Sequence, residues 1–140
     1  MRYAIRATEA RENYSRVLED AARVRPQVIR RLRDTIYWIS AEHLESMLAP
    51  CRLTLHISKD EDGSCFGVFD ELDIMDAGKD VAELKDNLAA ALREYAEAYM
   101  EEFTLYYSSP NRRRHLPYVW RIMMQTDLAG VVGLFDAVVE

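Results

Sequence analysis

Apolar residues near the start of the chain recur at the spacing of one helical face, which predicts an amphipathic helix. They are Ala10, Tyr14, Val17, Leu18, Ala21 and Ala22. A short extended segment, Tyr3–Arg6, precedes this helix, Thr8 stands where the helix needs an N-cap, and Pro26 closes it. We therefore expect a strand and then one helix before Pro26.

Two β-prone runs follow this helix. Gln27–Arg31 and Thr35–Ile39 are separated by a polar turn at Arg33 and Asp34, so they predict a hairpin. Ser40 is placed to cap a second helix. The apolar side of that helix comprises Leu44, Met47 and Leu48.

The middle of the chain begins with a strand pattern. Apolar and polar residues alternate from Cys51 to Ser58, which predicts a half-buried strand. Lys59–Gly63 reads as a hairpin loop, Ser64–Phe69 as the returning strand and Leu72–Gly78 as a third extended segment.

A long helix is predicted after these strands. Asp80 stands at its N-cap, and Glu83 is placed as the capping-box partner three residues later. Helical spacing continues to about Glu102 through Val81, Leu84, Leu88, Leu92, Tyr95, Ala98 and Tyr99.

The remaining residues combine turns and helices. Phe103–Tyr107 reads as a strand or as an extension of the long helix, and Ser108–Asn111 reads as a turn. Pro117 suits a helix start, and Thr126 is placed to cap a last helix. The apolar residues of that last helix are Leu128, Val131, Val132, Leu134, Phe135 and Val138.

The pattern as a whole predicts an α+β fold. We expect a first module at residues 1–50, an α/β module at residues 51–107, and a basic turn with C-terminal helices at residues 108–140. About 50 residues rarely bury enough apolar surface to fold alone. Consecutive large residues around Ile36 and Trp38 place apolar side chains on both faces of their strand. We therefore expect a symmetric dimer, with Ile36 and Trp38 at its interface.

Charge is distributed unevenly along the 140-residue chain, whose net charge is −6. Residues 1–33 contain nine arginines and four acidic side chains, whereas residues 51–108 contain five basic and fourteen acidic side chains. This asymmetry indicates one anion-binding face on an otherwise acidic body. The alternative is that the arginines only solvate a helix and a hairpin.

Arg11 is the most informative of these arginines. In a helix capped by Thr8 it would lie in the first turn, where the macrodipole disfavours a cation, and a residue that opposes a local rule is a functional candidate. Free N–H groups at a helix start also bind phosphate. Arg6, Thr8 and Arg11 are therefore candidate DNA contacts, and Arg31 in the hairpin is another. Alternatively, Arg11 only pairs with surface neighbours.

A second basic cluster lies in the last third of the chain. Arg112, Arg113 and Arg114 stand in a row before His115. They are candidate secondary phosphate contacts. The alternative is that they cap helix carbonyls and pair with the acidic module.

The sequence lacks the motifs of common catalytic sites. It has no P-loop, GxSxG or GxGxxG motif, and its histidines, His43, His56 and His115, have no metal-ligand spacing with the two cysteines. The loop before Phe69 lacks the final glutamate of a calcium loop. We expect no cofactor, no metal and no enzymatic activity. A Mg²⁺-dependent nuclease that uses acidic loops is the enzymatic alternative.

The sequence also bears on location. No apolar run approaches the roughly 20 residues that a membrane helix needs, and the first residues lack the apolar core of a secretory signal. Cys51 and Cys65 are expected as small buried residues in neighbouring strands. A cytoplasmic location without membrane association is the expectation.

Three short motifs in the first third of the chain resemble the Phd/YefM antitoxin family. They are TEAR at Thr8–Arg11, PQVIRR at Pro26–Arg31 and ISAEHL at Ile39–Leu44. The chain departs from the family pattern at Leu32, where a glycine is usual, and at Arg30, where a threonine is usual. The resemblance implies that Arg11 and Arg31 contact DNA.

Residues Leu53–Met100 resemble the HicB antitoxin fold. The matching words are DEDG, FDELD, DAGKD and AELKDNLAAAL, although the usual proline after Phe69 is absent. This second resemblance implies a HicB-like β-β-β-α module, packed with a Phd/YefM-like β-α-β-β-α module, that binds a partner and catalyses no reaction.

Together the two resemblances imply the antitoxin of a type II toxin–antitoxin system. Such a protein neutralises a cognate toxin by direct binding and, as a dimeric repressor, regulates transcription of its own promoter by binding operator DNA. A RelE-like ribonuclease is one candidate toxin. The alternative is a partner-binding protein of antitoxin fold without DNA recognition.

Overall fold

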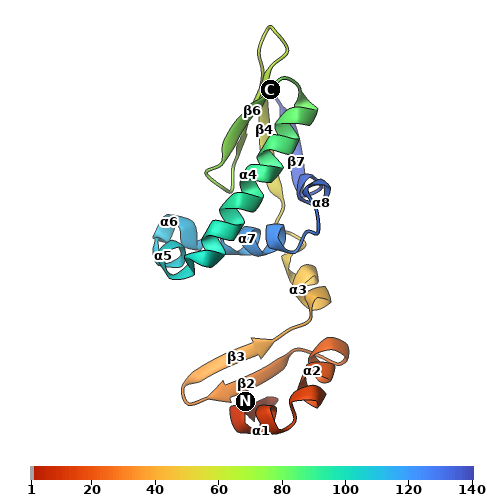
Figure 1. The fold of residues 1–140 in the computed structure, drawn as a ribbon, viewed down its shortest axis with the longest axis vertical. Coiled ribbons are helices and arrows are strands. Elements are labelled where there is room, and N and C mark those ends of the chain that lie inside the picture. The colour runs from red at the N-terminus through yellow and green to blue at the C-terminus, as the bar shows by residue number, and fades with distance from the viewer. Residues whose placement is uncertain (1) are drawn as a thin grey trace. The chain divides into compact units, whose positions relative to one another are not determined.

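The computed structural model of the chain describes residues 2–140. The chain divides into two compact units, residues 1–47 (unit 1) and residues 48–140 (unit 2). The elements of unit 1 are β1 (Ala4–Arg6), α1 (Ala7–Glu12), α2 (Tyr14–Arg23), β2 (Gln27–Arg31), β3 (Asp34–Trp38) and α3 (Ala41–Leu48), at whose end the division falls (Figure 1).

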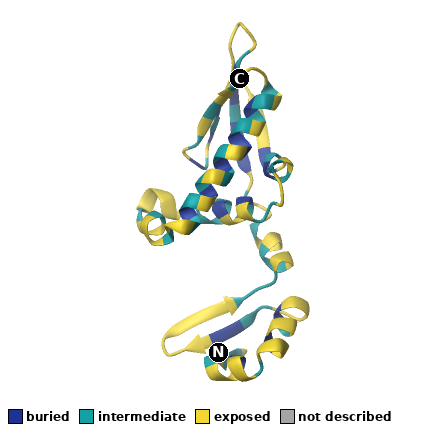
Figure 2. Ribbon diagram, in the orientation of Figure 1, coloured by how far each residue is buried: buried dark blue, intermediate teal, exposed yellow. Residues whose placement is uncertain are grey.

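Unit 1 contains a three-stranded sheet in the order β1-β2-β3. β2 runs parallel to β1 and antiparallel to β3. Its small core joins Ala10 and Val17 of the helices to Ile29 of β2, and Trp38 packs against this cluster. β3 is exposed over most of its length, whereas β2 contains the buried Val28 and Ile29 (Figure 2). The predicted first strand and hairpin are therefore present, on a core that is small for a folded unit.

The prediction of a single helix between Thr8 and Pro26 is wrong. The chain forms two helices instead, because Asn13 leaves helical geometry with φ −118° and ψ 36°. Both the backbone N–H and the side-chain amide of Asn13 donate to the carbonyl of Glu9, at 3.0 and 3.1 Å. An asparagine that competes for backbone acceptors in this way ends a helix.

The hairpin turn lies one residue earlier than expected, at Leu32 and Arg33. Arg31 and Asp34 are partners in the ladder, so the loop has two residues, and β3 begins at Asp34. Leu32 has a φ of +55°, in the left-handed region that costs a residue with a side chain about 1–2 kcal/mol. This is where the Phd/YefM pattern has a glycine.

Two predicted helix caps are confirmed. The Ser40 hydroxyl accepts from the backbone N–H of His43 at 3.1 Å before α3. The Asp80 carboxylate accepts from the N–H of Glu83 at 2.8 Å at the start of the long helix. Both residues bond to the N–H three positions on, which is the geometry that their chemistry favours.

Unit 2 contains a four-stranded sheet with a long helix against it (Figure 1). Its elements are β4 (Leu53–Lys59), β5 (Cys65–Phe69), β6 (Met75–Gly78), α4 (Val81–Glu101), α5 (Phe103–Ser108), α6 (Pro110–Arg113), α7 (Leu116–Met123), α8 (Leu128–Val132) and β7 (Phe135–Val139). The sheet order is β6-β5-β4-β7, with β7 parallel to β4 and the other pairs antiparallel. Buried residues of β4 and α4 dominate the core, among them Leu53, Leu55, Ile57, Leu84, Leu88, Leu92 and Tyr99.

The last helix expected from Thr126 to Val138 is wrong. Asp127 caps the short helix α8 by accepting from the N–H of Gly130 at 2.8 Å, and the chain then forms β7. Phe135 packs edge-on against Phe69 with ring centroids 5.0 Å apart. The run from Phe135 to Val139 therefore belongs to the sheet, because β4 offers it a ladder that no local pattern reveals.

Smaller differences concern the tail and the cysteines. Phe103–Tyr107 extends as helix α5, and α6 begins inside the expected turn at Pro110. Pro117 lies in the first turn of α7, as expected. Cys65 is buried in β5, but Cys51 precedes β4 and is only half-buried, and both thiols are free. The expectation that both cysteines lie buried in neighbouring strands is therefore wrong for Cys51.

Candidate nucleic-acid interface

Three arginines of unit 1 meet around one surface hollow of about 710 Å³. Its lining residues are Arg6, Ala7, Thr8, Arg30, Arg31 and Leu32. We call this hollow the basic hollow. Arg6 and Arg30 are partners in the parallel ladder, and Arg31 ends β2. The structure thus brings together three of the predicted DNA contacts, Arg6, Thr8 and Arg31.

The strand pattern explains why these side chains gather. Ile5 and Ile29 are ladder partners that pack in the small core. The next residue of each strand, Arg6 in β1 and Arg30 in β2, is therefore exposed. Successive strand residues point to opposite faces. Arg30 and Arg31 therefore flank the end of β2 from both faces of the sheet.

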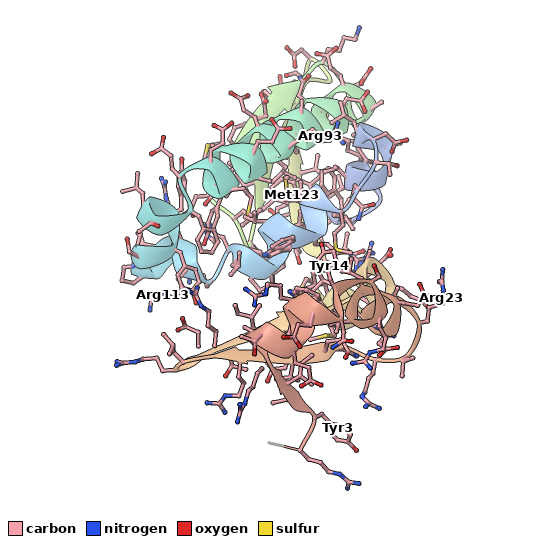
Figure 3. All side chains as sticks on the ribbon, turned by 60° about the horizontal axis from the view of Figure 1, so that its bottom comes forward. Tyr3, Tyr14, Arg23, Arg93, Arg113 and Met123 are labelled. Carbon is pink, nitrogen blue, oxygen red and sulfur yellow. The ribbon has the colours of Figure 1, made fainter. Side chains whose placement is uncertain are left out.

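No described residue supplies an acidic partner to the guanidinium groups of the basic hollow. Within residues 2–140 no ion pair involves Arg6, Arg30 or Arg31, although Asp34 lies opposite Arg31 in the ladder. By contrast, Arg23 at the end of α2 binds Glu19 at 2.9 Å and projects from the helix (Figure 3). Like charges side by side in a sheet are unfavourable, and a bound anion relieves that repulsion.

Two arguments made from the sequence about α1 are wrong. Arg6, and not Thr8, is the N-cap, and no side chain caps this helix. Because the helix also ends at Glu12, Arg11 lies in its last turn, where a cation is favoured. The macrodipole therefore gives no reason to single out Arg11. Thr8 nevertheless lines the basic hollow.

Arg11 lies at a different, mainly apolar hollow of about 230 Å³. Its lining residues are Ala7, Ala10, Arg11, Tyr14, Ile29, Ile36 and Trp38. Trp38 meets Tyr14 edge-on with ring centroids 5.7 Å apart, whereas Ile36 remains 49% exposed. The two residues predicted for a dimer interface thus lie on one face of the hairpin, with Ile36 the more open.

The opposite face of the hairpin carries an apolar hollow of about 490 Å³. It is lined by Pro26, Tyr37, Ile39, Leu44 and Met47. Tyr37 is 56% and Met47 68% exposed. Both faces of β3 therefore present uncovered apolar surface, as expected for consecutive large side chains in one strand.

The row Arg112 to Arg114 in unit 2 does not form one patch. Arg112 lies over the ring of Tyr106 at 4.8 Å and Arg113 over that of Tyr107 at 5.2 Å. Arg114 instead lines a separate hollow of about 220 Å³ with Asp70, Glu71 and Tyr118. Two of the three guanidinium groups are thus engaged with aromatic rings of α5.

A buried polar pair lies beside these rings. The Tyr95 hydroxyl and Nδ1 of His115 are 2.7 Å apart. Burial raises the pKa of Tyr95 to about 12 and lowers the pKa of His115. Near neutral pH both groups are therefore uncharged, and Nε2 of the imidazole finds no partner among the described residues.

A second histidine of unit 2 bridges two carboxylates. Nε2 of His56 lies 2.9 Å from Asp70, and its Nδ1 lies 2.8 Å from Glu140. Hydrogen bonding to Asp70, and then to Glu140, raises the pKa of His56. Neither histidine was singled out by sequence spacing, because their partners are distant in the chain.

Arg30 is a residue of the basic hollow that the prediction from sequence missed. It departs from the Phd/YefM pattern, where threonine is usual, and this departure is the signal that marks it. The structure places it in the basic hollow. Across residues 2–140 no group of three His, Cys, Asp or Glu side chains could hold a metal ion. The helices in the described part of the chain are too short or too polar to span a membrane.

The described residues thus form an α+β protein with a basic hollow on its smaller unit and an acidic larger unit. Over residues 1–137 the chain matches the PHD-like family model, described as "Antitoxin of toxin-antitoxin, RelE / RelB, TA system". The chain belongs to this family of antitoxins.

A solved structure supports the same assignment. The chain is similar to the crystal structure of "an antitoxin part of a putative toxin/antitoxin system" from Syntrophomonas wolfei subsp. wolfei. The TM-score is 0.93 and the sequence identity 31%, over 98% of this chain and 99% of that one. No curated protein matches the chain. Both units therefore occur together in one solved antitoxin-like chain.

Proposed function

We propose that this antitoxin acts in a type II system, neutralising a cognate toxin by direct binding and repressing its own promoter as a dimer. The observation that supports the DNA-binding part is the basic hollow, in which Arg6, Arg30 and Arg31 converge with no acidic partner among residues 2–140. Exposed guanidinium groups bind phosphate oxygens through short, charge-assisted hydrogen bonds.

The proposed DNA contacts are Arg6, Thr8 and Arg31, with Arg30 added. Arg30 and Arg31 flank the end of one strand, so one can bind a phosphate while the other reaches a base edge. Arg11 is kept as a further contact, because Ala7 lines both its hollow and the basic hollow. Arg112, Arg113 and Arg114 are proposed only as secondary phosphate contacts.

The proposed dimer uses the hairpin of unit 1. Ile36 is half exposed and lies with Trp38 at an apolar hollow, which a second copy would cover. A two-fold dimer presents the basic hollow twice, so the proposed operator is a short palindrome upstream of the coding region.

The proposed modules follow the two family resemblances. Residues 1–50 would be the Phd/YefM-like DNA-binding and dimerisation module, and residues 51–107 the HicB-like module, completed by residues 108–140 through β7. The proposed toxin is a small basic protein, of which a RelE-like ribonuclease is one example, and the proposed location is the cytoplasm. Neutralisation would need no catalysis by the antitoxin.

Two assays in cells test this function. The adjacent reading frame is expressed alone, when it should arrest growth, and then with the antitoxin, which should restore growth. A reporter behind the upstream DNA should be repressed by the wild type and released by Arg31→Ala, which should still restore growth. Arg23→Ala, which removes a paired arginine, is the matched control and should repress normally. Repression unaffected by Arg31→Ala would contradict the DNA-binding assignment.

A further inference from the structure

The two edges of the sheet in unit 2 differ. β6 and β7 are the edge strands, and each carries an exposed alanine at its centre, Ala77 and Ala137. An uncovered edge strand presents unpaired backbone N–H and C=O groups to which another strand can add. What surrounds each alanine decides which edge is open.

Side chains close the β6 edge. The N–H of Ala77 donates to the Asp76 carboxylate at 2.8 Å, and the Asn87 amide donates to the carbonyl of Ala77 at 2.9 Å. Both backbone groups of Ala77 are therefore occupied. Asp76 also places a charge on that edge, which natural sheets use to prevent strand addition.

Among the described residues, no side chain bonds to the outer edge of β7 in this way. Leu134 accepts from the N–H of Leu53 at 2.9 Å, and Glu140 donates to the carbonyl of Ile57 at 2.8 Å. In a parallel ladder alternate residues bond to one neighbour, so the intervening Phe135, Ala137 and Val139 turn their N–H and C=O groups outward.

The side chains along the open edge are suited to a strand partner. Val138 is 44% and Val139 58% exposed, and β7 contains no lysine or proline. Asp136 is held by Arg52 at 2.9 Å, and Glu140 by His56 at 2.8 Å. The charges at this strand are thus already paired, and the edge itself is apolar.

Charge selects between partners for this edge. Residues 51–140 contain nine basic and seventeen acidic side chains, a balance of −8. A second copy would bring two such acidic bodies together, whereas a basic protein is attracted by the same field. A basic partner with an apolar edge strand is therefore favoured over self-association.

We infer that the toxin docks by adding one of its β-strands to the outer edge of β7. This inference rests on the proposed function and names the docking surface that the proposed function leaves open. Backbone bonds to Ala137 and Val139 would supply affinity, and the acidic body would supply attraction for a basic toxin.

Matched lysine substitutions on the two edges test the inference. Ala137→Lys places a charge on the open edge, and Ala77→Lys places the same charge on the closed one. With purified antitoxin and the growth-arresting product of the adjacent reading frame, calorimetry should show Ala137→Lys weakening binding at least about tenfold. Ala77→Lys should leave the Kd within about threefold of the wild type.

Two further variants separate a loss of docking from a loss of folding. The N–H of Ala137 points outward and makes no bond to β4. Ala137→Pro therefore removes a donor to the toxin strand without breaking the ladder, and it should weaken binding like Ala137→Lys. If Ala137→Lys lowers the thermal midpoint, Val139→Lys is measured in its place. Loss of affinity in a variant that keeps its Tm supports docking at β7.

Three results would overturn the inference. Equal affinity of Ala137→Lys and the wild type, with growth rescue intact, would refute the β7 site and leave the proposed function standing. Sedimentation of the isolated antitoxin that changes with Ala137→Lys would show that a second copy occupies the edge. Failure of the wild type to restore growth would refute the proposed function together with this docking site.

Discussion

The two units of this antitoxin differ in the size of their buried cores. Unit 2 has a core cluster of seventeen buried residues, whereas the cluster of unit 1 has three, Ala10, Val17 and Ile29. Unit 1 also leaves apolar hollows on both faces of β3. A unit with so small a core gains stability from what it binds, whereas unit 2 has the core of an independent domain.

The same contrast holds for charge. The histidine and arginine at the β7 side of unit 2 are paired with carboxylates, as in Arg52 with Asp136. The arginines of the basic hollow in unit 1 are unpaired. A cluster of unpaired like charges attracts ligands of the opposite charge. The difference supports the proposal that unit 1 binds DNA and that unit 2 binds a protein partner.

Loss of core packing in unit 2 should have the largest effect. Leu88 is fully buried in α4, so Leu88→Ala should cost about 2–5 kcal/mol of unfolding free energy through the lost contacts and the cavity. Calorimetry should show the transition of unit 2 falling while that of unit 1 is unchanged. A shared shift of both transitions would show that the units fold as one.

Removal of the apolar side chain at Ile36 should dissociate the proposed dimer. Ile36→Asp places a charge in the apolar hollow, and a charge without a partner there costs several kcal/mol. Light scattering should then give a monomer at micromolar concentration. Met75→Asp is the control, since Met75 is 61% exposed on β6 of unit 2, and it should leave the mass unchanged.

Acid should weaken unit 2 through His115. Burial holds the folded-state pKa of His115 below its ordinary value of 6.5, so the unfolded chain takes up a proton first. The neutral, buried His115 makes its full contribution to the free energy of unfolding above pH 6.5. That contribution is lost as the pH falls below 6.5. His115→Asn should flatten this part of the stability profile, measured by urea unfolding between pH 5 and 7.

His56 should act in the opposite direction. Its carboxylate partners raise its folded-state pKa above 6.5, so its contribution is present below pH 6.5 and is lost as the pH rises through the folded pKa. His56→Gln should therefore remove a decline in stability on the alkaline side. The same urea series, extended upward in pH, separates the two histidines.

Relief of turn strain should have the smallest effect. Leu32 is 92% exposed and has φ +55°, so Leu32→Gly loses little packing and removes strain. Glycine also adds freedom to the unfolded chain, so the net gain for unit 1 should be about 0.5 kcal/mol. Leu32→Ala is the control and should bring no gain, because alanine keeps the Cβ. A loss of stability in Leu32→Gly would show that the side chain packs.

The sequence was sufficient to predict those parts of the structure that depend on residues close together in the chain. Ser40 and Asp80 cap their helices because each bonds to an N–H three residues on. Alternation located β4, and the hairpin loop that follows it located β5. The break at Asn13 was missed because helical spacing of apolar residues continues across it. The apolar pattern also could not distinguish a helix from a strand at Phe135 to Val139, since only the pairing with β4 decides.

The candidate site was foreseen in part for the same reason. Arg6 and Arg31 could be named from charge and resemblance, but their meeting with Arg30 depends on the parallel pairing of β1 and β2. Arg11 was favoured by an argument about the first helical turn that fails once the helix ends at Glu12. Residues from different strands meet only through strand pairing, so a site that they form cannot be predicted from the spacing of residues along one strand.

The salt dependence of binding to the DNA upstream of the coding region tests the central claim most directly. Fluorescence anisotropy should show wild-type binding that weakens with salt, and Arg31→Ala should lose about 1–3 kcal/mol if it reads a base, or about one unit of the log–log salt slope if it binds phosphate. Arg23→Ala should match the wild type. Binding that is absent, or equal in the wild type and Arg31→Ala, would contradict the assignment of DNA recognition to the basic hollow.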